Sequence, residues 1–107
     1  MNVEIKGIHL EVTESIRQYI DTKMPRLDFA KDLMVDFLLT LTREKNLFKA
    51  DATVNFRWGS TIHMGVENFN LNTGIDDLFD RLEAKVEKEK SKVQEHHKKQ
   101  ETAREHG

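Results

Sequence analysis

The segment that most constrains the fold is residues 71–92, which carries a continuous amphipathic pattern. A helix turns by about 100° per residue, so side chains three and four positions apart share one face. The apolar stripe that results consists of Leu71, Ile75, Leu78, Leu82 and Val86, with Phe79 at its edge. Such a stripe has to be covered by other apolar surface. The pattern therefore predicts one long helix packed along the body of the domain.

The charged residues of this segment are also sorted by face. A cationic stripe runs beside the apolar one and consists of Arg81, Lys85, Lys88 and Lys92. Acidic residues gather on a third face, away from these cations, and they are Asp76, Asp80, Glu83 and Glu87. Spacing alone leaves two interpretations open. Either the charges only solvate the helix, which is the common role of a charge run, or the cations follow a phosphate backbone.

The chain before this helix alternates with the two-residue period of β-strands. Four strands are predicted, covering residues 2–6, 34–43, 48–57 and 61–67. A polar connection at residues 44–46 and a turn at residues 58–60 separate the last three, with Gly59 expected at positive φ. Asn70 or Asn72 is expected to cap the long helix. Consecutive hairpins of this kind predict a mainly antiparallel sheet.

A first helix is predicted to follow Thr13, whose hydroxyl can cap it. Pro25 predicts a kink or an end near Lys23, because proline lacks the N–H that continues a helix. The apolar stripe of this helix is Val12, Ile16, Tyr19, Ile20, Met24 and Leu27. The order β-α-β-β-β-α then predicts an α+β two-layer sandwich, a four-stranded mainly antiparallel sheet with both helices packed on one face.

The length of 107 residues is that of a single domain. We assign residues 1–93 to it. Residues 94–107 contain only Ala103 as an apolar side chain, so they are predicted to form a disordered or frayed helical C-terminal tail.

Composition limits the classes of function. The 17 basic and 19 acidic residues give a net charge of −2, so a nucleic-acid partner would have to be recognised by a local patch and not by bulk charge. The chain has no cysteine, which excludes disulfides and thiolate chemistry. The first ten residues lack a long apolar run, so we expect no secretory signal, no membrane association and a cytoplasmic location.

Signatures of enzymes and metal sites are scarce. The sequence has no glycine-rich phosphate loop and no nucleophile elbow. The carboxylate pairs are expected on an exposed helix face, where nothing raises a pKa. His96 and His97 are neighbours on a helix and point about 100° apart, which makes a poor chelate. We therefore predict no catalytic residue, no metal, no cofactor and no small-molecule substrate.

Two further groups are candidate contacts. Lys23 and Arg26 lie close to the apolar face of the first helix, and they would extend the cationic stripe if the two helices pack side by side. About five neutralised phosphates would give a salt slope of roughly −4 to −5 on duplex-like nucleic acid. Arg57 and Trp58 stand at a hairpin tip. Trp58 either stacks on a base or fills a partner's pocket, or folds back over the end of the sheet.

The order of these residues resembles the short ribosome hibernation-promoting factors and ribosome-associated inhibitor A proteins, also known as sigma-54 modulation or S30EA-type proteins. The similarity runs from about Asn2 to Lys92. Its main motifs are Gly7 with residues 11–14, residues 16–20 with Lys23, residues 44–45, 50–54 and 62–63, and Ile75-Asp76-Asp77-Leu78-Phe79-Asp80-Arg81-Leu82.

This resemblance implies a fold similar to double-stranded RNA-binding domains. It implies binding in the decoding channel of the small ribosomal subunit, where the protein blocks messenger and transfer RNA in stress or stationary phase. Long members of the family append a dimerising domain, so a short form is expected to be monomeric off the ribosome. Basic residues of both helices contact ribosomal RNA in the family, which corresponds here to Lys23, Arg26, Arg81, Lys85, Lys88 and Lys92.

The chain also departs from the family pattern. Glu83, Ala84, Glu87 and Glu89 dilute the positive charge of the second helix, and Asn72 replaces a common tyrosine. Trp58 stands where a second turn glycine is frequent, one residue is added around Ser60, and Pro25 is unusual in the first helix. The alternative is therefore a divergent paralogue that acts as a protein-binding regulatory module. The length of the tail does not decide between pairing of ribosomes and holding single inactive ones.

Overall fold

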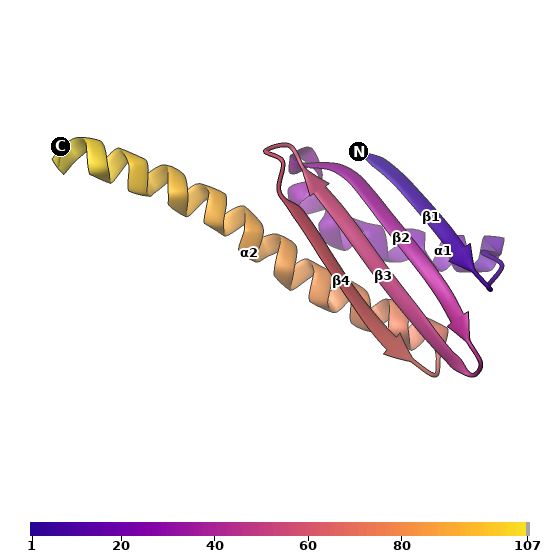
Figure 1. Ribbon diagram of the computed structural model, residues 1–107. Helices are drawn as coiled ribbons and strands as arrows, with labels where there is room; N and C mark the ends of the chain where they lie inside the picture. The colour runs from indigo at the N-terminus through magenta and orange to yellow at the C-terminus, as the bar shows by residue number, and fades with distance from the viewer. Residues whose placement is uncertain (107) are drawn as a thin grey trace.

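The computed structural model describes the backbone of residues 1–106 and the side chains of residues 1–92. Its elements are β1 (Asn2–Ile8), α1 (Glu14–Lys23), the 3-10 helix η1 (Met24–Leu33), β2 (Met34–Glu44), β3 (Leu47–Phe56), β4 (Thr61–Asn68) and α2 (Leu71–His106). The predicted order β-α-β-β-β-α is confirmed. Figure 1 shows the helices on one side of the sheet, with α2 running diagonally and past its end.

The four strands lie in sequence order, β1-β2-β3-β4. β1 pairs in parallel with β2, which is possible because α1 and η1 carry the chain back between them. The other two pairs are antiparallel hairpins. The expected mainly antiparallel sheet is therefore confirmed. β1 and β4 are therefore the two edge strands. Because α2 contacts β3 and β4, it lies over the β4 half of the sheet.

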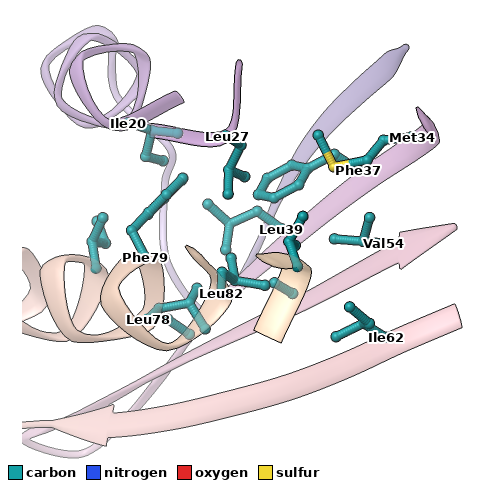
Figure 2. Packing of buried hydrophobic residues seen from close by; sticks show 14 of the residues in the cluster. Ile20, Leu27, Met34, Phe37, Leu39, Val54, Ile62, Leu78, Phe79 and Leu82 are labelled. Atoms are coloured by element: carbon teal, nitrogen blue, oxygen red, sulfur yellow. The ribbon is translucent and has the colours of Figure 1, made fainter. Parts of the chain in front are cut away.

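A single apolar core fills the space between the sheet and the helices. Figure 2 shows Ile20 and Leu27 from α1 and η1 pointing toward the same space as Phe79 of α2. Phe37 and Phe79 form a tilted aromatic pair with ring centroids 6.0 Å apart. The predicted stripe of α2 supplies five fully buried side chains, which are Ile75, Leu78, Phe79, Leu82 and Val86. These positions fix the rotation of α2 about its own axis.

Local sequence signals determine where the elements begin and end. The backbone N–H of Ile16 donates to Thr13 Oγ1 (3.3 Å), which is the predicted cap of α1. The backbone N–H of Thr73 donates to Asn70 Oδ1 (3.0 Å), so Asn70 and not Asn72 caps α2. Gly59 has φ 87°, as expected for the turn between β3 and β4.

Pro25 ends the first α-helix where the sequence predicts it. α1 stops at Lys23, and the chain continues as η1 with Pro25 in its first turn. A proline fits there, because the first N–H groups of a helix have no intrahelical acceptor. The tighter η1 contributes Leu27 and Ala30 to the core and leads directly into β2.

Ion pairs join η1 and the end of α1 to α2. The Asp76 carboxylate accepts from Lys23 Nζ (2.8 Å) and from the Tyr19 hydroxyl (2.5 Å). Arg26 donates from Nη2 to Asp80 and to Glu83, both at 2.6 Å. The bond from Lys23 is the main cause that lowers the pKa of Asp76, and Asp76 in turn raises the pKa values of Lys23 and Tyr19. The helices are therefore held together by charge as well as by the core.

The long helix α2 continues as backbone helix through His106. Side chains beyond Lys92 lie outside the described residues, so the disordered or frayed tail at 94–107 stays a prediction. No helix in the described part of the chain is both long and apolar enough to cross a bilayer.

The Asp76 cluster predicts a specific dependence of stability on pH. Because its pKa is lowered on folding, Asp76 stabilises the fold above its unfolded value of about 3.9, and this contribution is lost as pH falls through the lower folded value. Asp76→Asn should lower the Tm by a few degrees at neutral pH, and the difference from the unmodified protein should shrink as the pH falls below about 3.9 and the Asp76 carboxylate of the folded protein becomes protonated. Thermal unfolding followed by circular dichroism over this range measures both.

Asp21→Asn is the matched control, since Asp21 is an exposed residue of α1 and the substitution removes the same charge. It should leave the Tm nearly unchanged at neutral pH. Equal effects of the two substitutions would show that net charge, and not the bonds of Asp76, determines the difference.

Candidate nucleic-acid interface

The rotation of α2 places its four predicted cations on one exposed flank. We call Arg81, Lys85, Lys88 and Lys92 the cationic flank; all four side chains are exposed. At about 100° per residue they lie to one side of the buried stripe, while Asp76, Asp80 and Glu83 lie to the other. Since those three carboxylates face α1 and η1, the cationic flank is the side of α2 that points away from them.

Three of the four cations of this flank form no ion pair with the described side chains. Arg81 contacts Asp77 one turn before it, with Nε 3.3 Å from Oδ2. Among the side chains of residues 1–92, no carboxylate forms an ion pair with Lys85, Lys88 or Lys92. An exposed ion pair such as Arg81–Asp77 contributes little and is readily exchanged. The flank therefore presents positive charge to solvent.

Two of the glutamates that are interspersed with these cations in the sequence have partners outside the flank. Glu83 accepts from Arg26, on the opposite side of the helix. Glu89 accepts from the Ser60 hydroxyl at 2.8 Å, at the end of the sheet. In the sequence these residues alternate with the lysines, but in the structure each has a partner of its own. Composition along the helix thus understates the separation of charge around it.

One geometric expectation is wrong. Lys23 and Arg26 were expected to extend the cationic stripe, but they lie on the other flank of α2, where they pair with Asp76, Asp80 and Glu83. The physical reason is complementarity, because these acidic residues form a row along α2 that faces α1 and η1. The two groups of basic residues therefore do not form one groove.

Trp58, at the tip of the hairpin, both packs against the end of the sheet and remains partly exposed. Its ring stacks on Phe56, with centroids 5.0 Å apart and an angle of 18° between the planes. The residue is still 40% exposed. Arg57 is exposed, and its backbone N–H donates to the carbonyl of Leu33 (3.0 Å). Trp58 thus folds back over the end of the sheet and still leaves surface for a partner.

Other candidates have ordinary structural roles. His63 lies on the open face of the sheet, with Nδ1 2.9 Å from Thr53 Oγ1. Within the described residues, no three metal-ligating side chains come together. His96 and His97 lie outside the described side chains. The contact that sequence reasoning missed is Ser60 with Glu89, and neither residue carries a signal that would have indicated it.

Comparison with known proteins gives matches along nearly the whole chain. A family model described as "Sigma 54 modulation protein / S30EA ribosomal protein" matches residues 3–94. The ribosome hibernation promoting factor of Escherichia coli K12 is 30% identical over 96 residues, which are 90% of this chain and all of the relative. That of Pseudomonas putida KT2440 is 31% identical over 94 residues, 88% of this chain and 91% of the relative.

Solved structures agree with this similarity. The N-terminal domain of Protein Y from Thermus thermophilus superposes with a TM-score of 0.73 at 30% identity, covering 82% of this chain and 98% of that one. A ribosomal subunit interface protein from Coxiella burnetii gives 0.78 at 23% identity, with coverage of 85% and 99%, and supports the fold alone. From the fold, the family model and these relatives together, the chain belongs to the family of sigma 54 modulation proteins and S30EA ribosomal proteins.

Proposed function

We propose that this protein is a ribosome-associated translation inhibitor that occupies the decoding channel of the small subunit and blocks messenger and transfer RNA. The observation that carries the proposal is the exposed cationic flank of α2. Family membership supports it, because relatives about 30% identical over most of this chain are named ribosome hibernation promoting factors. A ribosomal partner also implies a cytoplasmic location.

The cationic flank has the shape and charge to follow an RNA backbone. From Lys85 to Lys92 a helix rises by about 10 Å. A nucleic-acid duplex carries one negative charge per about 1.7 Å of its axis, so this length faces several phosphates. The flank lies on a helix that the core holds in place. On binding, only the lysine side chains themselves therefore have to lose conformational freedom. Contacts of this type recognise A-form shape and phosphates more than base sequence.

The net charge of −2 does not oppose this proposal. Three of the carboxylates of α2 pair with the two cations Lys23 and Arg26, on the side away from the cationic flank, which leaves one negative charge there uncompensated. A phosphate that approaches the lysines meets their charge first, because exposed charges beyond about 10 Å are largely screened at moderate salt. The local field at the flank, and not the total charge, determines the interaction.

Lys23 and Arg26 remain part of the proposed ribosomal RNA contact in a more restricted role. Both side chains are only partly exposed, at 25% and 32%, and both already have carboxylate partners. A phosphate would have to replace Asp76, Asp80 or Glu83. We therefore propose that they contribute less to RNA affinity than Lys85 and Lys88.

A protein-binding regulatory module is the second candidate, and one observation favours it. Phe69, just before α2, is 77% exposed and lies in a shallow hollow with Leu47. An exposed aromatic of this kind is typical of protein contacts. Binding through Phe69 would be weakened by Phe69→Ser and would respond little to salt.

Charge reversal on the cationic flank tests the proposed function. Lys85→Glu combined with Lys88→Glu should remove most co-sedimentation with purified small ribosomal subunits, because two cations become anions that repel phosphate. The Tm should change little, since both side chains are exposed and have no ion pair in the described part of the chain. A sucrose gradient and a thermal melt give the two readouts.

Lys6→Glu combined with Lys31→Glu is the matched control. These lysines are also exposed, and the same four units of charge are changed at sites away from the flank. The control should retain co-sedimentation. If both pairs bind as the unmodified protein does, the cationic flank is not the contact.

Salt dependence supplies an independent test. With the four cations of the flank in contact, the logarithm of affinity for an A-form RNA duplex should fall against the logarithm of salt concentration with a slope of about −3 to −4. Lys85→Glu with Lys88→Glu should make this slope shallower by about 2. Fluorescence anisotropy of a labelled duplex measures both slopes. A flat dependence would show that the cations of the flank do not contact phosphates.

A further inference from the structure

The turn between β3 and β4, residues 57–60, lies directly beside the cationic flank. The bond from the Ser60 hydroxyl to Glu89 joins the turn to α2. Glu89 comes four residues after Lys85 and three before Lys92, so these side chains are neighbours on the helix surface. Figure 1 shows α2 running past the end of the sheet at which this turn lies.

Trp58 presents an aromatic ring that is already held in place. One face of the ring stacks on Phe56, which is itself buried at 3% exposure. Since Trp58 is 40% exposed, part of its ring system is open to solvent. Gly59 beside it has φ 87°, and a Cβ placed there would meet no atom within 4 Å. The approach to the turn is therefore open, and a partner would not have to order the ring.

The charges around Trp58 favour a nucleobase over a protein side chain. Arg57 is the preceding residue in the turn, and Lys85 and Lys92 lie one helical turn to either side of Glu89, the residue of α2 that the turn contacts. The Glu89 carboxylate between these lysines already accepts from the Ser60 hydroxyl. The centres of protein interfaces are depleted in charged residues, whereas single-stranded nucleic acids are bound by aromatic rings set among cations. An unpaired nucleotide has a flat base that can stack on the Trp58 ring. The backbone phosphates on either side of that nucleotide can contact the lysines.

We propose that Trp58 is a stacking site for an unpaired base of RNA, whose adjacent phosphates contact the cationic flank. In the proposed function, the protein recognises only the charge of the RNA backbone. The stacking site rests on that function and adds a preference for RNA with an exposed base. Phe56 supports the ring from below, so the base would become the third member of a stack. Arg57 supplies a further cation at the same site.

The single tryptophan of the chain makes the test direct, because all tryptophan emission comes from Trp58. The probes are two RNA hairpins with equal numbers of phosphates, one fully paired and one with an unpaired adenine bulge. The bulged hairpin should quench Trp58 emission and bind about tenfold more tightly than the paired one. The paired hairpin should bind, as seen by anisotropy of a label on the RNA, without quenching.

Trp58→Leu should keep the affinity for the paired hairpin and lose the preference for the bulged one, and a thermal melt of this variant checks that it folds. If both hairpins bind equally and emission does not change, the stacking site is refuted while the cationic flank remains supported. If neither hairpin binds by anisotropy, RNA contact itself fails and the inference fails with it. Loss of small-subunit co-sedimentation in Trp58→Leu without any RNA-induced quenching would assign Trp58 to a protein contact and also refute the proposal.

Discussion

Burial of the apolar stripe of α2 against the sheet is the interaction on which the other features depend. Once Leu78, Leu82 and Val86 point into the core, every remaining position on the helix has a fixed direction. The acidic row then faces η1 and the cations face away from it. A helix with the same composition but a shuffled order would have no such separation. Positive charge is concentrated here by packing, in a chain whose total charge is negative.

The ion pairs of Lys23 and Arg26 complete this arrangement. They join three carboxylates of α2 to two cations of the same chain. They also attach the end of α1 and the start of η1 to α2. One flank of α2 therefore carries ion pairs to α1 and η1, and the other carries exposed lysines, for which we propose a role in recognition.

Sequence patterns predict the elements of this fold well, because the signals involved are local. Thr13 and Pro25 define the two ends of α1 within a few residues of themselves, and Gly59 is required by the geometry of its own turn. The buried positions of α2 follow from helical periodicity. None of these features needs knowledge of where another element lies.

Contacts between distant elements were not predictable in the same way. Arg26 forms a hydrogen bond with Glu83, which lies 57 positions away in the sequence. Predicting this pair requires the rotation and the relative offset of both helices. The bond between Ser60 and Glu89 and the stack of Trp58 on Phe56 depend on how a turn closes over the end of the sheet. Spacing identified the cationic flank correctly but misplaced Lys23 and Arg26, because it treats each helix alone.

The sheet order has a consequence for self-association. β4 is an edge strand, and an uncovered edge offers backbone groups that can pair with another chain. α2 lies over this half of the sheet with its lysines turned outward. Two molecules that joined along β4 with their helices on the same side would bring Lys85 and Lys88 of each copy toward those of the other. Like-charge repulsion would oppose that union, so the residues proposed to attract RNA would also disfavour pairing of two copies along this edge.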